Sequence, residues 1–382
     1  MITQLYHVQL QRVLDLFFKA KKASLMLEGT FGIGKTYAMR EFAKRKAKEL
    51  GLTFSEDFAD VNDETKFSFL VFVLHHYEPG EFKGIPYPDK DRQFTIYLPM
   101  KQLPINPAKK AVLFIDEINS ASDMLRKNAY QLIEDRRIGS YRVPDGVLVC
   151  GAGNKSTDKC NVYDREMALC NRFLWAELLV PPVDDIDIEE NGKKVTVNGW
   201  LTDFAIKNNI DHRIQNYLRS NKNHLYTYDP NQDDPDKTQA TPRIWAKVSD
   251  LLVGVPDDDF WTLETAVGMG CGTGIGATFT AWIKLKAKYD IPKIYKELKL
   301  VVPTEVSLRY SLISGLIGHY LENKTQDRAV ALTKLSLQFS REHTLMILNQ
   351  VKYADTNFFK NLKVGDPKLY SSLADDVFKY LL

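Results

Sequence analysis

Eight consecutive residues combine the types and the spacing that can hold a phosphate group. Their glycines, lysine and threonine match the pattern G-x-x-x-x-G-K-[ST] at every fixed position. In such a loop the backbone N–H groups turn inward and cradle an anion, and the N-terminus of the following helix favours negative charge. We expect the lysine to reach the β- and γ-phosphates of ATP and the threonine hydroxyl to ligate Mg²⁺. In chain order the eight residues are Gly29, Thr30, Phe31, Gly32, Ile33, Gly34, Lys35 and Thr36.

A second set of chemically active residues follows an apolar run. Residues 112–115 are all apolar and predict a buried strand, and Asp116 and Glu117 come directly after it. In open α/β sheets, ligands bind at the carboxyl ends of the strands, which is where these two carboxylates would lie. Asp116 would hold the Mg²⁺, and Glu117 would polarise the water that attacks the γ-phosphate.

The segments around these residues predict the elements that position them. Residues 23–28 are mainly apolar and predict a strand before the glycine loop, and residues 37–50 are rich in Ala, Lys, Arg and Glu and predict a helix after it. Strands that alternate with helices indicate an α/β fold with a parallel sheet and helices on both faces. Further strands are expected at 67–77, 93–98, 111–115, 147–150 and 172–180, and helices at 4–22 and 121–134.

Composition changes at Pro181-Pro182, and the chain beyond residue 242 is helical in pattern. Asn191-Gly192 predicts a hairpin turn. The expected organisation is a nucleotide-binding α/β core over residues 1–182, a linker, hairpin and helical lid over 183–285, and a helical region over 286–382.

The bulk properties exclude several classes of protein. The 382 residues carry a net charge of only +2, which gives no overall electrostatic reason to bind nucleic acid. No apolar run reaches the roughly 18 residues of a membrane span, and the N-terminus lacks a signal-peptide pattern. Four cysteines include no C-x-x-C pair. His75 and His76 are neighbours on a predicted strand and so would point to opposite faces, which argues against a metal site. We expect a reduced cytoplasmic protein without a membrane segment.

These motifs together resemble the AAA+ superfamily, and within it the MoxR-type ATPases, which carry an insertion in the second helix. The resemblance spans roughly residues 20–285, and the motifs occur in the family's order. One departure is Asn171, where many relatives have an acidic residue. The matching segments are 78–86, 114–119, 131–137, 140–146, 147–154, 171–173 and 241–245.

The resemblance implies roles for further residues. Asn154 would hold the attacking water or a γ-phosphate oxygen. Arg172 would act on the γ-phosphate of the neighbouring subunit as an arginine finger, with Arg165 as a competitor for that role. Arg243, which opens a lid helix, would sense the γ-phosphate in cis or in trans.

The resemblance also implies an assembly and an activity. The fold would be an AAA+ core with a helical lid and a C-terminal helical extension. The chain would form a homo-oligomeric ring, with a hexamer as the expected form, and would hydrolyse ATP to remodel a client protein. MoxR-type ATPases often work with a protein that carries a von Willebrand factor A domain.

Two other functions remain open at this point. The first is a DNA-acting motor of the same superfamily, for which Arg136, Arg137 and Arg142 lie near the relevant hairpin. The second is a scaffold that assembles on binding ATP and hardly turns it over. For a protein-remodelling ring, the candidates to face the pore or the client are Phe82, Lys83, Arg136, Arg137, Tyr141 and Arg142.

Overall fold

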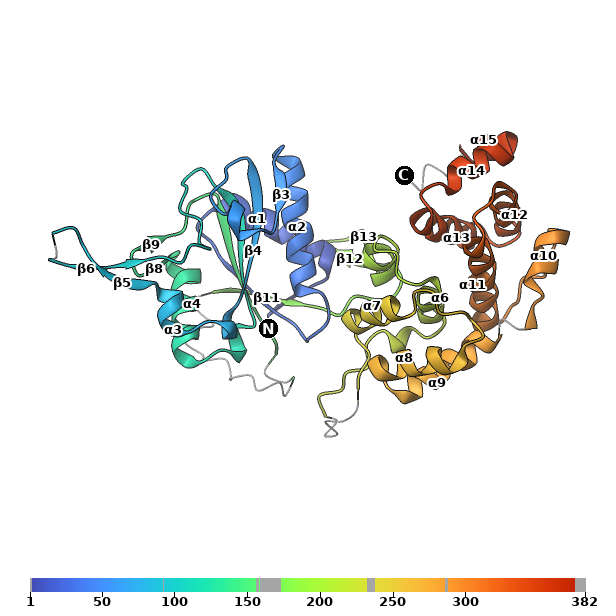
Figure 1. Cartoon of the computed structure of the whole chain (residues 1–382), viewed down its shortest axis with the longest axis horizontal. Helices are drawn as coiled ribbons and strands as arrows, with labels where there is room; N and C mark the ends of the chain where they lie inside the picture. The colour runs from blue at the N-terminus through green and yellow to red at the C-terminus, as the bar shows by residue number, and fades with distance from the viewer. Residues whose placement is uncertain are drawn as a thin grey trace. The chain divides into compact units, whose positions relative to one another are not determined.

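The computed structural model describes residues 2–91, 93–155, 158, 173–231, 238–285 and 288–374. The chain divides into two compact units, Met1–Pro181 and Pro182–Leu382 (Figure 1). Among the described residues, no helix is both long and apolar enough to cross a membrane.

The described part of the first unit contains a seven-stranded sheet, and every pair of neighbouring strands is parallel. The predicted α/β class with a parallel sheet is therefore confirmed. The order across the sheet is β1-β11-β2-β10-β7-β4-β3. The strands are β1 (Thr3–Leu5), β2 (Leu25–Glu28), β3 (Thr53–Ser55), β4 (Lys66–Val73), β7 (Lys110–Asp116), β10 (Val147–Gly153) and β11 (Leu174–Leu178).

Helices cover both faces of this sheet, as alternation along the strands requires (Figure 1). On one face Leu113 and Ile115 of β7 pack with Leu132 of α4. On the other face Phe18 of α1 contacts Phe42 of α2 and Phe67 of β4. The helices are α1 (His7–Ala20), α2 (Lys35–Glu49), α3 (Pro79–Lys83) and α4 (Asp123–Asp135), with short 3₁₀ turns η1 (Phe58–Asp60), η2 (Leu74–His76) and η3 (Ile118–Ser120).

Two predicted boundaries in the first unit are wrong. The helix expected from residue 4 begins only at His7, because Thr3–Leu5 pairs with β11 as an added edge strand. The strand expected over 67–77 ends at Val73, and the 3₁₀ turn η2 replaces its last residues. The described part of this unit also contains two small hairpins: β5 (Ile85–Pro88) with β6 (Thr95–Leu98), and β8 (Arg137–Ile138) with β9 (Tyr141–Arg142).

The described residues of the second unit form helices and one hairpin. That hairpin joins β12 (Ile186–Glu190) to β13 (Lys193–Val197), and Asn191 and Gly192 both have positive φ in its turn. One apolar core gathers around Tyr217, Trp245 and Phe279, and another around α11. The helical elements are η5 (Leu201–Ala205), α6 (His212–Ser220), η6 (Lys222–His224), α7 (Pro242–Leu251), α8 (Phe260–Cys271), α9 (Thr273–Leu285), α10 (Ile291–Glu297), α11 (Val306–Glu322), α12 (Gln326–Ser336), α13 (Arg341–Ala354), α14 (Phe358–Gly365) and α15 (Pro367–Ala374).

Candidate functional site

The glycine loop connects β2 to α2 in a tight turn that side chains would obstruct. Gly34 has a φ of 96°, in the left-handed region that favours glycine. A Cβ at Gly29 would lie 2.8 Å from Ile33 Cδ1 and 3.0 Å from the Leu178 carbonyl oxygen. Helix α2 begins at Lys35, directly after the loop. The backbone thus forms a compact turn at a helix N-terminus, the arrangement that binds phosphate.

Lys35 is buried and connects the loop to the neighbouring strand. Its Nζ donates to the carbonyl oxygens of Gly29 at 2.7 Å and Thr30 at 3.0 Å, and to Asn154 Oδ1 at 2.8 Å. Asn154 directly follows β10, which lies between β2 and β7 in the sheet. The structure therefore brings together two predicted site residues that are 119 positions apart in the chain.

Thr36 and Asp116 also meet. The Thr36 hydroxyl donates to Asp116 Oδ2 at 2.7 Å, and the Glu117 backbone N–H donates to Asp116 Oδ1 at 2.9 Å. Hydroxyl and carboxylate oxygens are ligands that Mg²⁺ accepts, and Mg²⁺ is usually held by one or two protein groups with water and phosphate. Among the described residues no group of three or more His, Cys, Asp or Glu side chains could hold a metal ion. The residues present fit a Mg²⁺ that takes its other ligands from ATP and water.

Glu117 adopts an unusual backbone conformation beside an unexpected partner. Its φ is 55°, which is uncommon for a residue other than glycine and is found disproportionately at functional sites. Its Oε2 lies 2.9 Å from His75 Nδ1, and both side chains are about two-fifths exposed, at 41% and 38%. His75 belongs to η2, just after β4, and β4 is the neighbour of β7 with Val73 opposite Asp116. This contact was not predictable from the sequence, because the pattern places His75 inside a strand whereas β4 ends at Val73.

The end of β10 is fixed by a second amide. Asn119 Nδ2 donates to the Asn154 carbonyl oxygen at 2.8 Å. A Cβ at Gly153 would lie 2.5 Å from Asn119 Oδ1, so glycine leaves the room that this contact needs. Asn119 follows Asp116 and Glu117 by only a few residues, and it ties their loop to Asn154.

Charged residues just past Asn154 border the site. Lys155 forms an ion pair with Glu177 of β11, and its backbone N–H donates to Asp158 Oδ2 at 3.3 Å. Burial raises the pKa of the Asp158 carboxyl, although that hydrogen bond and the charges of Lys35 and Lys155 act in the opposite direction. The sequence does not predict Glu177 or Asp158 as site residues, because neither belongs to a motif.

The structure does not test the roles expected for the three arginines. Arg172 and its competitor Arg165 lie outside the described residues, as does Asn171. Arg243 is exposed in the first turn of α7, in the second unit. Thr241 caps that helix by accepting a hydrogen bond from the Ile244 backbone N–H at 3.2 Å.

Three residues expected to face a pore or a client are buried instead. Phe82 packs against Phe72 and Tyr77 in the core. The Arg136 guanidinium donates to the carbonyl oxygens of Pro144 and Val147, and the Tyr141 hydroxyl donates to the Pro104 carbonyl oxygen. Those three expectations are wrong: Phe82 is on the core-facing side of α3, Arg136 at the end of α4 is held by two carbonyl oxygens, and Tyr141 on β9 points inward. The other three candidates, Lys83, Arg137 and Arg142, are exposed.

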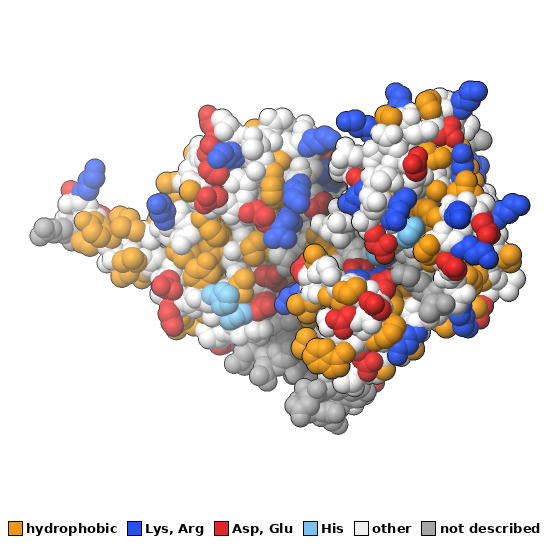
Figure 2. All heavy atoms as spheres, turned by 45° about the vertical axis from the view of Figure 1, so that its right-hand side comes forward, with side chains coloured by type: hydrophobic (Ala, Val, Ile, Leu, Met, Phe, Trp, Pro, Cys, Tyr) orange, Lys and Arg blue, Asp and Glu red, His pale blue; other side chains and the backbone are white. Residues whose placement is uncertain are grey.

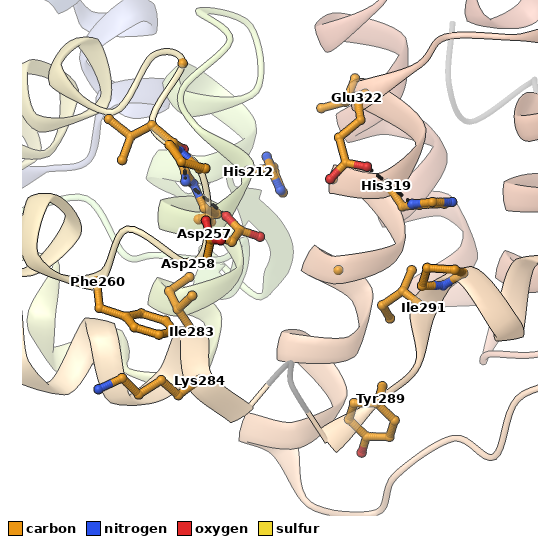
Figure 3. Close-up of a pocket in the computed structure, with 18 residues that line it drawn as sticks. His212, Asp257, Asp258, Phe260, Ile283, Lys284, Tyr289, Ile291, His319 and Glu322 are labelled. Carbon is orange, nitrogen blue, oxygen red and sulfur yellow. Dashed lines mark hydrogen bonds and ion pairs between the residues drawn. The ribbon is translucent and has the colours of Figure 1, made fainter.

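A separate cavity of about 820 Å³ lies within the second unit (Figure 3). His212, Asp257 and Asp258 line one side, and His319 and Glu322 of α11 line the other. His319 Nδ1 lies 3.3 Å from Glu322 Oε2. All of its lining residues belong to the second unit, so none of them is part of the site at β2, β7 and β10 in the first unit.

Comparison with known proteins gives only distant structural likeness. No protein-family model and no curated protein matches the sequence. PCH-2 of C. elegans is 12% identical with a TM-score of 0.31 and covers 74% of this chain and 70% of its own. A RuvB variant of Thermotoga maritima is 15% identical with a TM-score of 0.32, over 80% and 87% of the two chains. AMPPCP-bound DnaA of Aquifex aeolicus is 12% identical with a TM-score of 0.30, over 97% and 94%. These scores are too low to carry a functional conclusion.

Proposed function

We propose that this chain is a Mg²⁺-dependent ATPase of the AAA+ type. The observation that supports it most directly is the convergence of Lys35, Thr36, Asp116 and Asn154 at one edge of a parallel sheet through hydrogen bonds of 2.7 to 2.8 Å. A lysine on a glycine loop, a hydroxyl paired with a carboxylate and a strand-end amide are the parts that a nucleoside triphosphatase uses.

Each residue has a role that its position supports. Lys35 and the N-terminus of α2 would hold the β- and γ-phosphates. Thr36 and Asp116 would hold the Mg²⁺, which neutralises charge on the phosphate oxygens when it is bound. Asn154 would orient the attacking water or a γ-phosphate oxygen. Glu117 would accept a proton from that water once its carboxylate is released from His75.

The finer parts of the proposal concern assembly and partner. We propose a homo-oligomeric ring, a hexamer in the simplest case, in which Arg172 of one subunit stabilises charge on the γ-phosphate bound to the next. Arg243 would sense the same phosphate. The work done would be remodelling of a client protein, as in MoxR-type ATPases, with a von Willebrand factor A domain protein as one candidate partner.

Exchange of the Glu117 carboxylate for an amide tests the enzymatic assignment. Glu117→Gln should still bind ATP but should lose at least about 100-fold in the rate of phosphate release, since general-base catalysis contributes on that order. Steady-state phosphate release with Mg²⁺ measures the rate, and a fluorescent ATP analogue measures binding. Glu64→Gln, at an exposed position away from the loop, is the matched control and should behave as wild type.

The same experiment separates the alternatives. Equal rates for wild type and Glu117→Gln would contradict our assignment, and a wild type that binds ATP without turnover would indicate an ATP-gated scaffold. The DNA-acting alternative loses one of its three arginines, because Arg136 is buried. Arg137 and Arg142 remain opposite each other on β8 and β9.

A further inference from the structure

The β5–β6 hairpin carries an exposed apolar face. Ile85 lies opposite Leu98 and Tyr87 opposite Ile96, and alternation along both strands puts these four side chains on one face. Phe94, two residues before Ile96, continues the row. The exposed fractions are 67% for Ile85, 55% for Tyr87, 69% for Phe94, 37% for Ile96 and 45% for Leu98. Figure 2 shows hydrophobic side chains along the arm that projects from the first unit.

The opposite face of the hairpin is occupied by the protein itself. Tyr97 packs so closely on the β8–β9 turn that a Cβ at Gly139 would lie 3.1 Å from Tyr97 Cβ. The Tyr97 backbone N–H donates to Ser140 Oγ at 3.1 Å, and Lys83 Nζ lies 4.6 Å from the centre of the Tyr97 ring. The hairpin is therefore held at its base on the Tyr97 side, and its apolar row is the side left without a partner among the described residues.

The edges of the hairpin are poor places for another strand to join. Strand β5 contains Pro86 and Pro88, which have no backbone N–H to donate. On β6 the Tyr97 N–H is already used by Ser140. A partner would thus be bound through the apolar face rather than by extension of the two-stranded sheet.

We propose that this face, formed by Ile85, Tyr87, Phe94, Ile96 and Leu98, binds a short apolar segment of a partner polypeptide. The inference rests on the proposed function in one respect, namely that the partner is a protein on which the ATPase acts. None of the five side chains carries a charge, whereas binding of single-stranded nucleic acid combines aromatic residues with Lys and Arg along the backbone path. A neutral apolar row instead matches the uncharged residues of an unfolded or partly unfolded chain.

The size of the face argues against a second copy of this chain as its occupant. At these exposures the five side chains offer on the order of 500 Å². A stable protein–protein interface buries about 800 Å² on each partner. A dimer held by this face alone would bury less area than a stable interface needs. Weak, reversible binding of a short segment requires no larger area.

Fluorescence anisotropy with a labelled peptide tests the inference on the full chain. The probe is a short fluorescein-labelled peptide of alternating Leu, Phe and Ser, compared with a peptide in which Leu and Phe are replaced by Ser. We expect the apolar peptide alone to bind. Tyr87→Ser with Ile96→Ser should weaken its binding by about tenfold or more, because two side chains no longer bury apolar surface. Phe94→Ser, at the end of the row and outside β6, should weaken it without disturbing the strand pairing.

Matched controls and the ATPase rate separate the outcomes. Val253→Ser with Met269→Ser removes two exposed apolar side chains from the second unit and should leave peptide binding unchanged. All the hairpin variants should keep the basal ATPase rate of wild type. Peptide binding that survives every hairpin variant would overturn the inference. Binding of labelled single-stranded DNA instead of the apolar peptide would also overturn it. Self-association that the hairpin variants abolish, without any peptide binding, would overturn it too. A wild type that does not hydrolyse ATP would contradict the proposed function. The peptide-binding result would still support or overturn the docking face, because it is measured separately.

Discussion

At the residue scale, the contact between His75 and Glu117 bears most directly on the proposed hydrolysis. His75 Nδ1 lies 2.9 Å from Glu117 Oε2. The imidazole thus contacts the carboxylate that would have to accept a proton from water. Glu117 is also held in a left-handed backbone conformation, which the surrounding structure must support. The described structure thus has the proposed base engaged by another side chain.

Removal of His75 should release this carboxylate. We expect His75→Ala to raise kcat for ATP hydrolysis several-fold and to leave KM for ATP nearly unchanged, because His75 does not contact the phosphate loop in the described structure. His76→Ala, at the adjacent exposed position, is the control. A fall in kcat instead would show that His75 positions Glu117 for the reaction rather than holding it away.

Residues that carry chemistry were predictable from the sequence where a backbone rule placed them. Thr36 and Asp116 could be paired in advance because parallel strands end at the same edge of a sheet. Asn154 was predictable through its family resemblance. His75 was not, because its contact depends on where β4 ends and a 3₁₀ turn begins. The inward positions of Phe82, Arg136 and Tyr141 depend on how α3, the end of α4 and β9 pack on the core, which no motif encodes.

At the element scale, a buried arginine connects two parts of the second unit. Arg213 of α6 donates to the carboxylates of Asp211 and Asp257 and to the carbonyl oxygens of Leu252 and Val255. Burial opposes its charge, but the Asp211 and Asp257 carboxylates outweigh that effect and raise the pKa of Arg213. The side chain therefore joins the start of α6 to the loop between α7 and α8.

Truncation of this side chain should be costly. We expect Arg213→Ala to lower the free energy of unfolding of the second unit by about 3 kcal/mol or more, because it leaves buried acceptors without a donor. Lys207→Ala, which breaks the more exposed pair with Asp203, should cost less than about 1 kcal/mol. Urea titration followed by tryptophan fluorescence suits the measurement, since Trp245 and Trp282 are buried in this unit. Equal losses for the two variants would contradict the role of Arg213.

At the scale of the whole molecule, the proposed ring makes the ATP site a shared one. The described residues of the first unit supply the glycine loop, the Thr36–Asp116 pair proposed to hold Mg²⁺, and the strand-end amide of Asn154. The trans-acting role of Arg172 is the one that the family resemblance implies, and it requires a second subunit. The chain divides into its two units between Pro181 and Pro182. The sequence marks that position by composition alone, whereas the helical order of the second unit follows from no recognisable motif.

A mixing experiment tests the shared site. Arg172→Ala should bind ATP and hydrolyse it at least about 100-fold more slowly than wild type, given the size of arginine-finger effects. Equimolar mixing with Glu117→Gln should restore part of the activity, because some interfaces then combine an intact Arg172 with an intact Glu117. The rate of phosphate release of the mixture, compared with the sum of the separate variants, is the measurement. Arg165→Ala in parallel decides between the two arginines, and a mixture no faster than that sum would argue for a site complete within one chain.

The bond between Lys35 and Asn154 has a practical consequence for following this protein in solution. A γ-phosphate that draws the lysine Nζ to itself would deprive Asn154 Oδ1 of its 2.8 Å donor. The Asn154 backbone carbonyl would meanwhile stay tied to Asn119. The side-chain amide of Asn154 would then lose a hydrogen bond while its main chain stays in place. An isotope label on that amide would make Asn154 a built-in spectroscopic reporter of an occupied phosphate loop.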